Sequence, residues 1–137
     1  MKPLFADTFY FVALLSARDS AHDHAVGFSK RYPGEFVTTA WVLTELADAF
    51  SIPGKRQRVM ALFERLRADP KVAIVPASEE LFNLGLDLYG SRSDKDWSLT
   101  DCISFVVMSR HGLTEALTGD SHFEQAGFRA LLVEGAQ

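Results

Sequence analysis

Five short apolar stretches alternate with segments of helical character along this 137-residue chain, and this alternation restricts the fold more than any other feature. The stretches predicted as strands span residues 2–7, 35–38, 72–75, 115–118 and 129–133. Strands that are separated by helices pair in parallel, and helices then cover both faces of the sheet. The sequence therefore predicts an α/β fold with a central, mostly parallel five-stranded sheet.

Helical segments fill the intervals between these strands. Apolar periodicity, capping residues and the breaks at Pro33-Gly34, Pro53-Gly54 and Asp69-Pro70 define their limits. The predicted helices span residues 8–15, 20–32, 40–50, 55–68, 78–89, 99–110 and 120–126.

The helix predicted at 99–110 is apolar around nearly its whole circumference, which is typical of a buried helix. It carries one carboxylate, Asp101, near its start. Ser98 and Asp101 have the spacing of a capping box, in which the carboxylate satisfies the backbone at the helix start. Alternatively, the carboxylate meets hydrogen-bonding partners or a cation, because an unpaired buried charge is strongly destabilising. The residues alone leave both interpretations open.

The length of the chain fits a single domain over residues 1–137. No apolar run is long enough to span a membrane, and the first residues do not have the pattern of a signal peptide. The single cysteine, Cys102, cannot form a disulfide within the chain. These features predict a protein of the reducing cytoplasm.

The net charge of −4 argues against a protein that coats nucleic acid through a basic surface. That argument weakens if four of the acidic residues bind a metal. Basic residues gather on the helix predicted at 55–68, and they form either a solvated face or an RNA contact. These residues are Lys55, Arg56, Arg58, Arg65 and Arg67.

Four acidic residues fall where the predicted fold brings them to one end of the sheet. Asp7 ends the first strand, Asp120 follows the fourth, Asp101 begins the buried helix, and Glu45 borders the apolar face of helix 40–50. Sites in α/β sheets form beyond the carboxyl ends of the strands. Taken singly, Asp7 and Asp120 could be helix caps and Glu45 a solvated residue. Together, four carboxylates predict a site for Mg²⁺ or Mn²⁺, which prefer oxygen ligands.

The motifs around these acids resemble those of the PIN domain family. The motifs are Asp7-Thr8 after the first strand, Glu45 in T-E-L, Asp101 in W-S-L-T-D-C and Asp120 in T-G-D-S-H-F. In order and spacing they are most similar to VapC-type members, and the resemblance runs from Met1 to about Val133. It implies a PIN-like three-layer α/β/α domain.

The resemblance also implies a function, that of a metal-dependent endoribonuclease. Asp7, Glu45, Asp101 and Asp120 would hold one or two Mg²⁺ or Mn²⁺ ions, and a water activated by the metal would attack the phosphodiester. The products would carry a 5′-phosphate and a 3′-hydroxyl. The resemblance further implies the toxin of a type II toxin–antitoxin pair, with a small antitoxin protein as partner and a homodimer as its assembly. Some relatives have a further acid where Ser121 and His122 stand. This departure affects whether a second metal ion is bound.

Two other classes of α/β protein require an aspartate that this sequence lacks. A phosphotransferase of the haloacid-dehalogenase type requires an Asp where Phe9 stands, and a response-regulator receiver requires one where Val75 ends the third strand. The stronger alternative is a catalytically inactive PIN-like module that binds RNA or protein. Asp96, as a residue supporting Asp101, and His122, as a substrate contact, are weaker candidates for the site.

Overall fold

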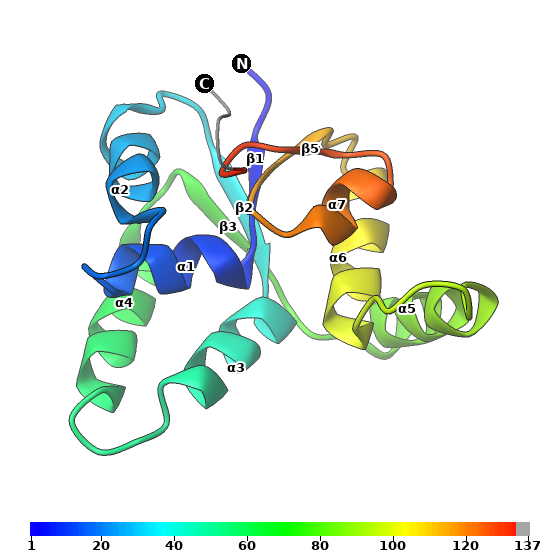
Figure 1. Ribbon diagram of the computed structural model, residues 1–137, viewed down its shortest axis with the longest axis horizontal. Helices are drawn as coiled ribbons and strands as arrows, with labels where there is room; N and C mark the ends of the chain where they lie inside the picture. Colours follow the sequence, from blue (N-terminus) through cyan, green and yellow to red (C-terminus); the bar gives the residue numbers. More distant parts are fainter. Residues whose placement is uncertain (134–137) are drawn as a thin grey trace.

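A five-stranded, entirely parallel sheet forms the centre of the computed structural model, which describes residues 1–133 (Figure 1). The strands lie in the order β3-β2-β1-β4-β5. Their bounds are β1 Leu4–Ala6, β2 Phe36–Thr39, β3 Val72–Val75, β4 Glu115–Leu117 and β5 Arg129–Ala130. The predicted fold class is therefore confirmed.

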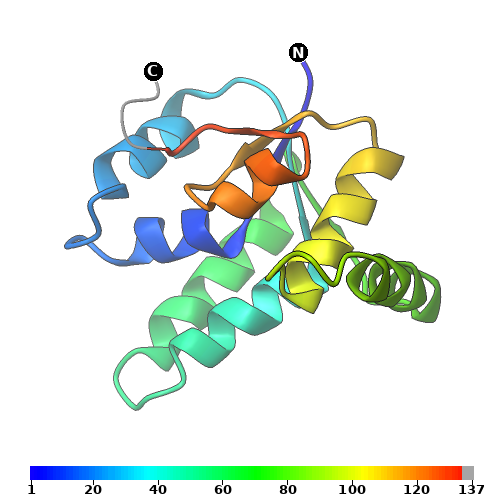
Figure 2. The same cartoon turned by 45° about the vertical axis from the view of Figure 1, so that its right-hand side comes forward.

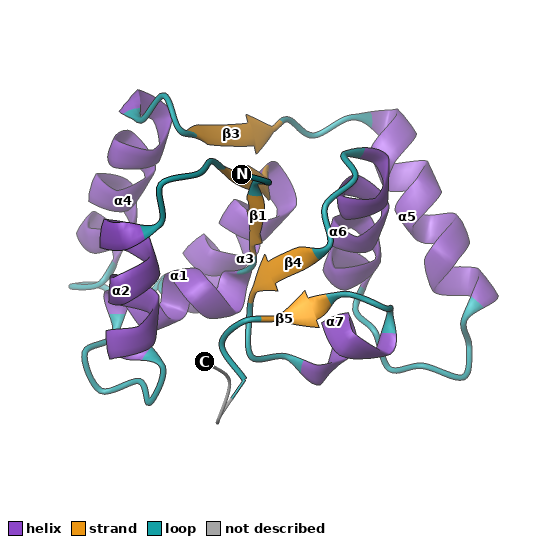
Figure 3. Ribbon diagram, turned by 90° about the horizontal axis from the view of Figure 1, so that it is seen from above, coloured by secondary structure: helices purple, strands orange, loops and turns teal. Residues whose placement is uncertain are grey.

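Helices lie on both sides of this sheet, with α1, α2 and α4 on one side and α5 and α6 on the other (Figure 3). Their bounds are α1 Thr8–Leu15, α2 His22–Arg31, α3 Ala40–Ala49, α4 Arg56–Ala68, α5 Glu79–Ser91, α6 Leu99–Arg110 and α7 Ser121–Gln125. None of these helices is long and apolar enough to cross a membrane. Residues 134–137 lie outside the described part of the chain, so the single domain over residues 1–137 stays a prediction.

The prediction was wrong about the length of the last strand, which ends at Ala130 rather than at residue 133. Leu131 and Leu132 are buried, as strand residues would be, but they lie in a turn. Their amides donate to the carbonyls of Ala116 and Thr118, both at 2.9 Å. Apolar character signals burial, and it does not distinguish a strand from a buried turn.

The central strand β1 is buried along its whole length and pairs with both β2 and β4. Its middle residue, Phe5, lies opposite Val37 on one side and Ala116 on the other. Because all strands run in the same direction, their carboxyl ends lie at the same edge of the sheet. The residues that follow β1 and β4 therefore come close together.

Side-chain caps fix the starts of the helices at this edge. The Oγ1 of Thr39 accepts a hydrogen bond from the amide of Val42 at 3.1 Å and so begins α3. Ser98 begins α6, and the capping box with Asp101 that the sequence predicts is present. Each cap satisfies an amide that the helix leaves unpaired.

Helix α5 packs against α6, on the side away from α1, α2 and α4 (Figure 2). The closest approach is at Gly85, which is buried. A Cβ atom at this position would clash with Cγ1 of Ile103 and lie 3.2 Å from its Cα. The two helices therefore require glycine at residue 85.

We expect Gly85→Ala to destabilise the protein by about 1–3 kcal/mol, the usual cost of overpacking. Gly90→Ala is the matched control, because a Cβ at the end of the same helix would have no neighbour within 4 Å. That control should leave stability unchanged or raise it slightly, since alanine favours the helix. Urea unfolding of both variants measures the difference, and equal stabilities would contradict the packing argument.

Candidate active site

The four predicted acids line one cleft at the carboxyl ends of the strands, with a volume of about 410 Å³. Six carboxylates line this cleft in all: Asp7, Asp19, Glu45, Asp96, Asp101 and Asp120. Asp7 directly follows β1, and Asp120 follows β4. Glu45 lies on α3 and Asp101 in the first turn of α6, whereas Asp19 lies in the loop after α1 and Asp96 in the loop before α6. Residues far apart in the sequence thus form one strongly acidic surface.

Asp7 is the most deeply buried of these acids, with 5% of its surface exposed. Its Oδ2 accepts a hydrogen bond from the Oγ1 of Thr118 at 2.8 Å. Asp7 occupies the N-cap position of α1, but its side chain makes no capping hydrogen bond. The interpretation of Asp7 as a helix cap is therefore wrong for its side chain.

Burial raises the pKa of Asp7 to about 7, and the charges of Asp101 and Glu45 add to this effect. The hydrogen bond from Thr118 opposes it without cancelling it. Without a cation in the cleft, the buried carboxyl group thus favours its neutral form.

Asp101 combines the two roles that its sequence context suggested. Its Oδ2 accepts a hydrogen bond from the amide of Ser98 at 3.2 Å, as a capping residue does. The same oxygen lies 3.0 Å from Nδ1 of His122, inside the cleft. Burial raises the pKa of Asp101, and the hydrogen bonds from His122 and Ser98 oppose this shift. Capping the helix and facing the cleft are compatible because the carboxylate has several acceptor sites.

Asp120 is a true helix cap that also lines the cleft. Its Oδ1 accepts a hydrogen bond from the amide of His122 at 2.9 Å. Its own amide donates to the Oγ1 of Thr118 at 3.1 Å. One threonine, donating to Asp7 and accepting from Asp120, therefore fixes the two acids relative to each other.

Glu45 is the most solvent-accessible of the four predicted acids. It is exposed on α3, and its Oε1 accepts a hydrogen bond from the Oγ1 of Thr8. Thr8 is the first residue of α1, so this bond joins α1 to α3 across the cleft. Thr8 both starts a helix and orients a carboxylate.

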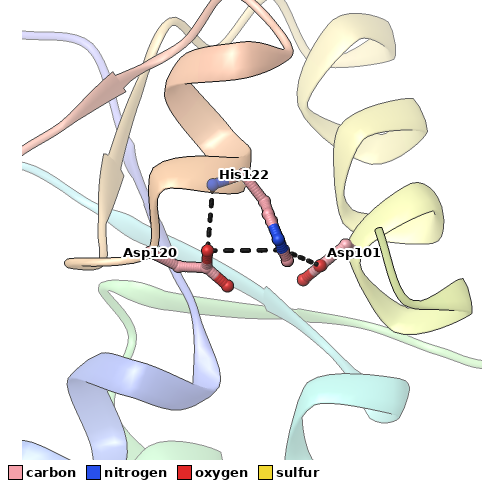
Figure 4. Close-up of side chains that lie close together, drawn as sticks. All are labelled: Asp101, Asp120 and His122. Carbon is pink, nitrogen blue, oxygen red and sulfur yellow. Dashed lines mark hydrogen bonds and ion pairs between the residues drawn. The ribbon is translucent and has the colours of Figure 1, made fainter. Parts of the chain in front are cut away.

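His122 lies among the acids of the cleft (Figure 4). Its Nδ1 is 3.0 Å from Asp101 and 3.3 Å from Asp120, and its Nε2 is 3.0 Å from Asp96. Burial lowers the pKa of His122, but the hydrogen bond to Asp101 and the charges of Asp120 and Asp96 outweigh it and raise the pKa. The surrounding acids therefore favour the protonated form of this imidazole.

Two residues of the cleft carry little signal in the sequence. His122 was expected only as a weak candidate for a substrate contact, although its position two residues after Asp120 places it on the first turn of α7. Asp19 was not identified, because no pattern in the loop after α1 distinguishes it. Asp96, predicted as a support for Asp101, contacts His122 instead.

The donor atoms fit a divalent cation. Single ligand atoms of Asp101, Asp120 and His122 all lie within 4.8 Å of one another. Carboxylate oxygens suit Mg²⁺ and Mn²⁺, and imidazole nitrogen is a common transition-metal ligand. Burial is the main cause of the raised pKa values of Asp7 and Asp101, and the charges of neighbouring acids add to it. A divalent cation bound here would favour the ionised forms of these acids.

Comparison with known proteins places this geometry in context. The model of a family described as PIN domain matches residues 4–129. The 23S rRNA-specific endonucleases VapC20 of two Mycobacterium tuberculosis strains, CDC 1551 / Oshkosh and H37Rv, are 29% identical over 126 residues, covering 91% of this chain and 95% of theirs.

Solved structures agree with this result. The crystal structure of M. tuberculosis VapC20, titled as a sarcin–ricin loop cleaving toxin, matches with a TM-score of 0.82 and 25% identity over 91% of this chain and 95% of its own. FitAcB from Neisseria gonorrhoeae matches with a TM-score of 0.63 and 20% identity, over 93% and 94% of the two chains, and supports the fold alone.

Proposed function

This chain belongs to the PIN domain family, and from that membership we propose that it is a metal-dependent endoribonuclease. The observation that carries the proposal is the convergence of Asp7, Glu45, Asp101 and Asp120 on one cleft. The relatives that match over most of the chain are RNA endonucleases by name, which supports a nuclease. The proposed substrate is RNA, with the sarcin–ricin loop of 23S rRNA as the first candidate.

The proposed metal ligands are Asp7, Glu45, Asp101 and Asp120, and the proposed cation is Mg²⁺ or Mn²⁺. When bound, the cation would activate water for attack on the phosphodiester and neutralise charge that develops on the phosphate. Among the residues described, the cleft offers no serine or cysteine nucleophile paired with a base, since Ser98 caps α6 and Cys102 is buried beside it. Hydrolysis by water thus fits the residues of the cleft.

The protein contributes preorganised acids. Thr118 holds Asp7 and Asp120 in fixed relation, and Ser98 holds Asp101. Thr8 orients Glu45, the most exposed of the four acids. Because these supports are hydrogen bonds from neighbouring side chains and backbone, the carboxylates need little rearrangement to bind a cation.

The proposal is tested by incubating the purified protein with an RNA stem-loop that carries the sarcin–ricin loop, in the presence of Mn²⁺. We expect cleavage that EDTA abolishes and that added Mn²⁺ restores. The ends of the products should be a 5′-phosphate and a 3′-hydroxyl, which primer extension and end-labelling identify. Binding of this RNA and of total RNA without any cleavage would favour the alternative of an inactive PIN-like binding module.

The proposal extends to partners and location. We propose that the protein is the toxin of a type II toxin–antitoxin pair and is inhibited by a small antitoxin protein. The similarity to VapC20, which is a toxin, supports this proposal. A homodimer is also proposed, and the exposed apolar side chains of Phe82, Leu84 and Leu86 on α5 support it.

An RNA substrate and the single cysteine support a cytoplasmic location. Light scattering tests the dimer, and co-expression with a small protein encoded beside the gene tests the antitoxin.

A further inference from the structure

The acidic cleft cannot by itself attract RNA. Six carboxylates line it, and within the described chain His122 is the only basic side chain among its lining residues. The imidazole of His122 already faces three of those carboxylates. Proteins bind nucleic acids largely through cations that contact phosphates. An RNA strand that enters this cleft therefore needs cationic side chains beside it.

A second hollow adjoins the cleft and shares Asp96 and Ser98 with it. It is formed by the end of α5 and the loop that leads to α6, and its volume is about 770 Å³. This volume lies within the range of about 300–1,000 Å³ that is usual for ligand pockets. The hollow is thus large enough for a nucleotide and borders the proposed catalytic centre.

Tyr89 and Lys95 are an aromatic and a cationic side chain of this hollow that are open to a ligand. Tyr89 lies near the end of α5 with 51% of its surface exposed. Lys95 is partly exposed and makes no ion pair with any residue of the described chain. An exposed aromatic ring and an uncommitted cation are the two kinds of group that bind unstacked nucleotides.

Arg92 and Trp97 form the wall of the hollow, and the carboxylate of Asp96, which also lines it, contacts His122. Arg92 donates through Nε and Nη2 to the two carboxylate oxygens of Asp94, at 2.9 and 3.0 Å. Its guanidinium also lies over the ring of Trp97, at 5.0 Å from the centroid. Trp97 is buried and donates from Nε1 to Gln125. These contacts hold the wall in place and leave Tyr89 and Lys95 free to bind.

We infer that this hollow is a nucleotide subsite that holds the RNA residue next to the cleaved phosphate. Tyr89 stacks on the base, and Lys95 contacts a backbone phosphate. The inference rests on the proposed ribonuclease function, because the substrate of the cleft is taken to be RNA. In this inference, residues 89–99 bind the substrate, and the acids of the cleft catalyse its hydrolysis.

Of the other pockets that cations line, one is unsuitable for this purpose. It lies between α1, α2 and α4, where Lys30 and Arg65 line it. It shares no lining residue with the acidic cleft. A strand bound there would not pass directly into the cleft, so the observations favour the hollow at residues 89–99.

The test measures binding of fluorescein-labelled single-stranded RNA by anisotropy in Mg²⁺, with Asp101→Asn in every protein so that the RNA stays intact. Tyr89→Ala should weaken binding about tenfold, as loss of one stacked base does. Tyr89→Phe should bind normally. Lys95→Ala should reduce the slope of log K against log salt by about 0.7, the value for one phosphate contact on a single strand.

Matched controls separate a specific contact from a general effect of charge. Lys71→Ala removes the same charge away from the hollow. Lys71 directly precedes the outermost strand β3, so it lies at the amino ends of the strands, whereas the acids lie at their carboxyl ends. This variant should bind RNA like the parent protein and keep its salt slope. Lys95→Arg should restore the slope. Tyr89→Ala should leave the slope unchanged, a result that a merely structural defect would not produce.

The same variants, made with Asp101 intact, distinguish the subsite from the function. If the parent cleaves RNA and the Tyr89 and Lys95 variants bind and cleave equally well, the subsite is overturned and the nuclease stands. If the parent does not cleave but the variants lose binding as expected, the nuclease fails and the hollow stands only as an RNA-binding site, with no cleaved phosphate beside it. Absence of RNA binding by the parent overturns the subsite.

Discussion

Replacement of Asp101 with asparagine is expected to abolish RNA cleavage and to leave the protein folded. The asparagine side chain would keep a carbonyl oxygen to accept the hydrogen bond from Ser98, so α6 keeps its cap. It would lack the negative charge that faces His122 and that we assign to the cation. Loss of even an outer partner of a metal ligand costs about 10–100-fold in activity, so loss of a ligand should cost at least about 100-fold. Initial rates of stem-loop cleavage in Mn²⁺ measure the effect.

The matched control is Ser98→Ala, which removes the capping hydroxyl and keeps the carboxylate of Asp101. This variant should lose about 1 kcal/mol of stability, the usual value of an N-cap, and retain most of its activity. Two results would show that Asp101 acts only as a helix cap. The Asp101→Asn protein would be unfolded, or it would be folded and cleave RNA as fast as the wild type.

The stability of the metal-free protein is expected to fall as the pH rises from about 4 to about 7, because of Asp7. The folded state raises the pKa of this carboxyl group from 3.8 to about 7. Between these values the folded protein retains a proton that the unfolded chain has released. Ionisation of Asp7 therefore opposes folding progressively through this range, by about 4 kcal/mol in total at 1.36 kcal/mol per unit of pKa.

Asp7→Asn should remove most of this pH dependence, because asparagine does not ionise. Urea unfolding in EDTA across the pH range measures it, with Asp87→Asn as a control for loss of an exposed carboxylate on α5. Above about pH 7, Mn²⁺ should raise the melting temperature of the wild type and have a smaller effect on Asp7→Asn, since a ligand stabilises the state that binds it. Parallel pH profiles of the wild type and Asp7→Asn would show that Asp7 is not protonated in the cleft.

Local sequence patterns predicted most of the fold. Alternating strands and helices specified a parallel sheet, and capping residues such as Ser98 and Thr39 marked the helix starts. These signals succeed because they depend on neighbouring residues only. They fail where a buried residue does not lie in a strand or helix. Leu131 and Leu132, for example, are apolar and buried but lie in a turn.

Four site residues could be chosen from the sequence because the ends of parallel strands meet at one edge, and Asp7 and Asp120 follow two neighbouring strands. Glu45 could be chosen because it borders the apolar face of its helix, and the motifs that resemble those of the PIN domain family include it. Their convergence on one cleft is now visible. Their role in binding metal is the proposal that the experiments above examine.

The sequence by itself determined the order of the elements, the parallel sheet and which acids stand at its carboxyl edge. The tertiary structure decided how those acids are held, through contacts such as that of Thr118 with Asp7, 111 residues apart. It also placed His122 among three carboxylates and opened the hollow beside Tyr89. Periodicity and capping act within a few residues of the chain, whereas these contacts depend on how whole helices pack on the sheet, and no local pattern encodes that packing.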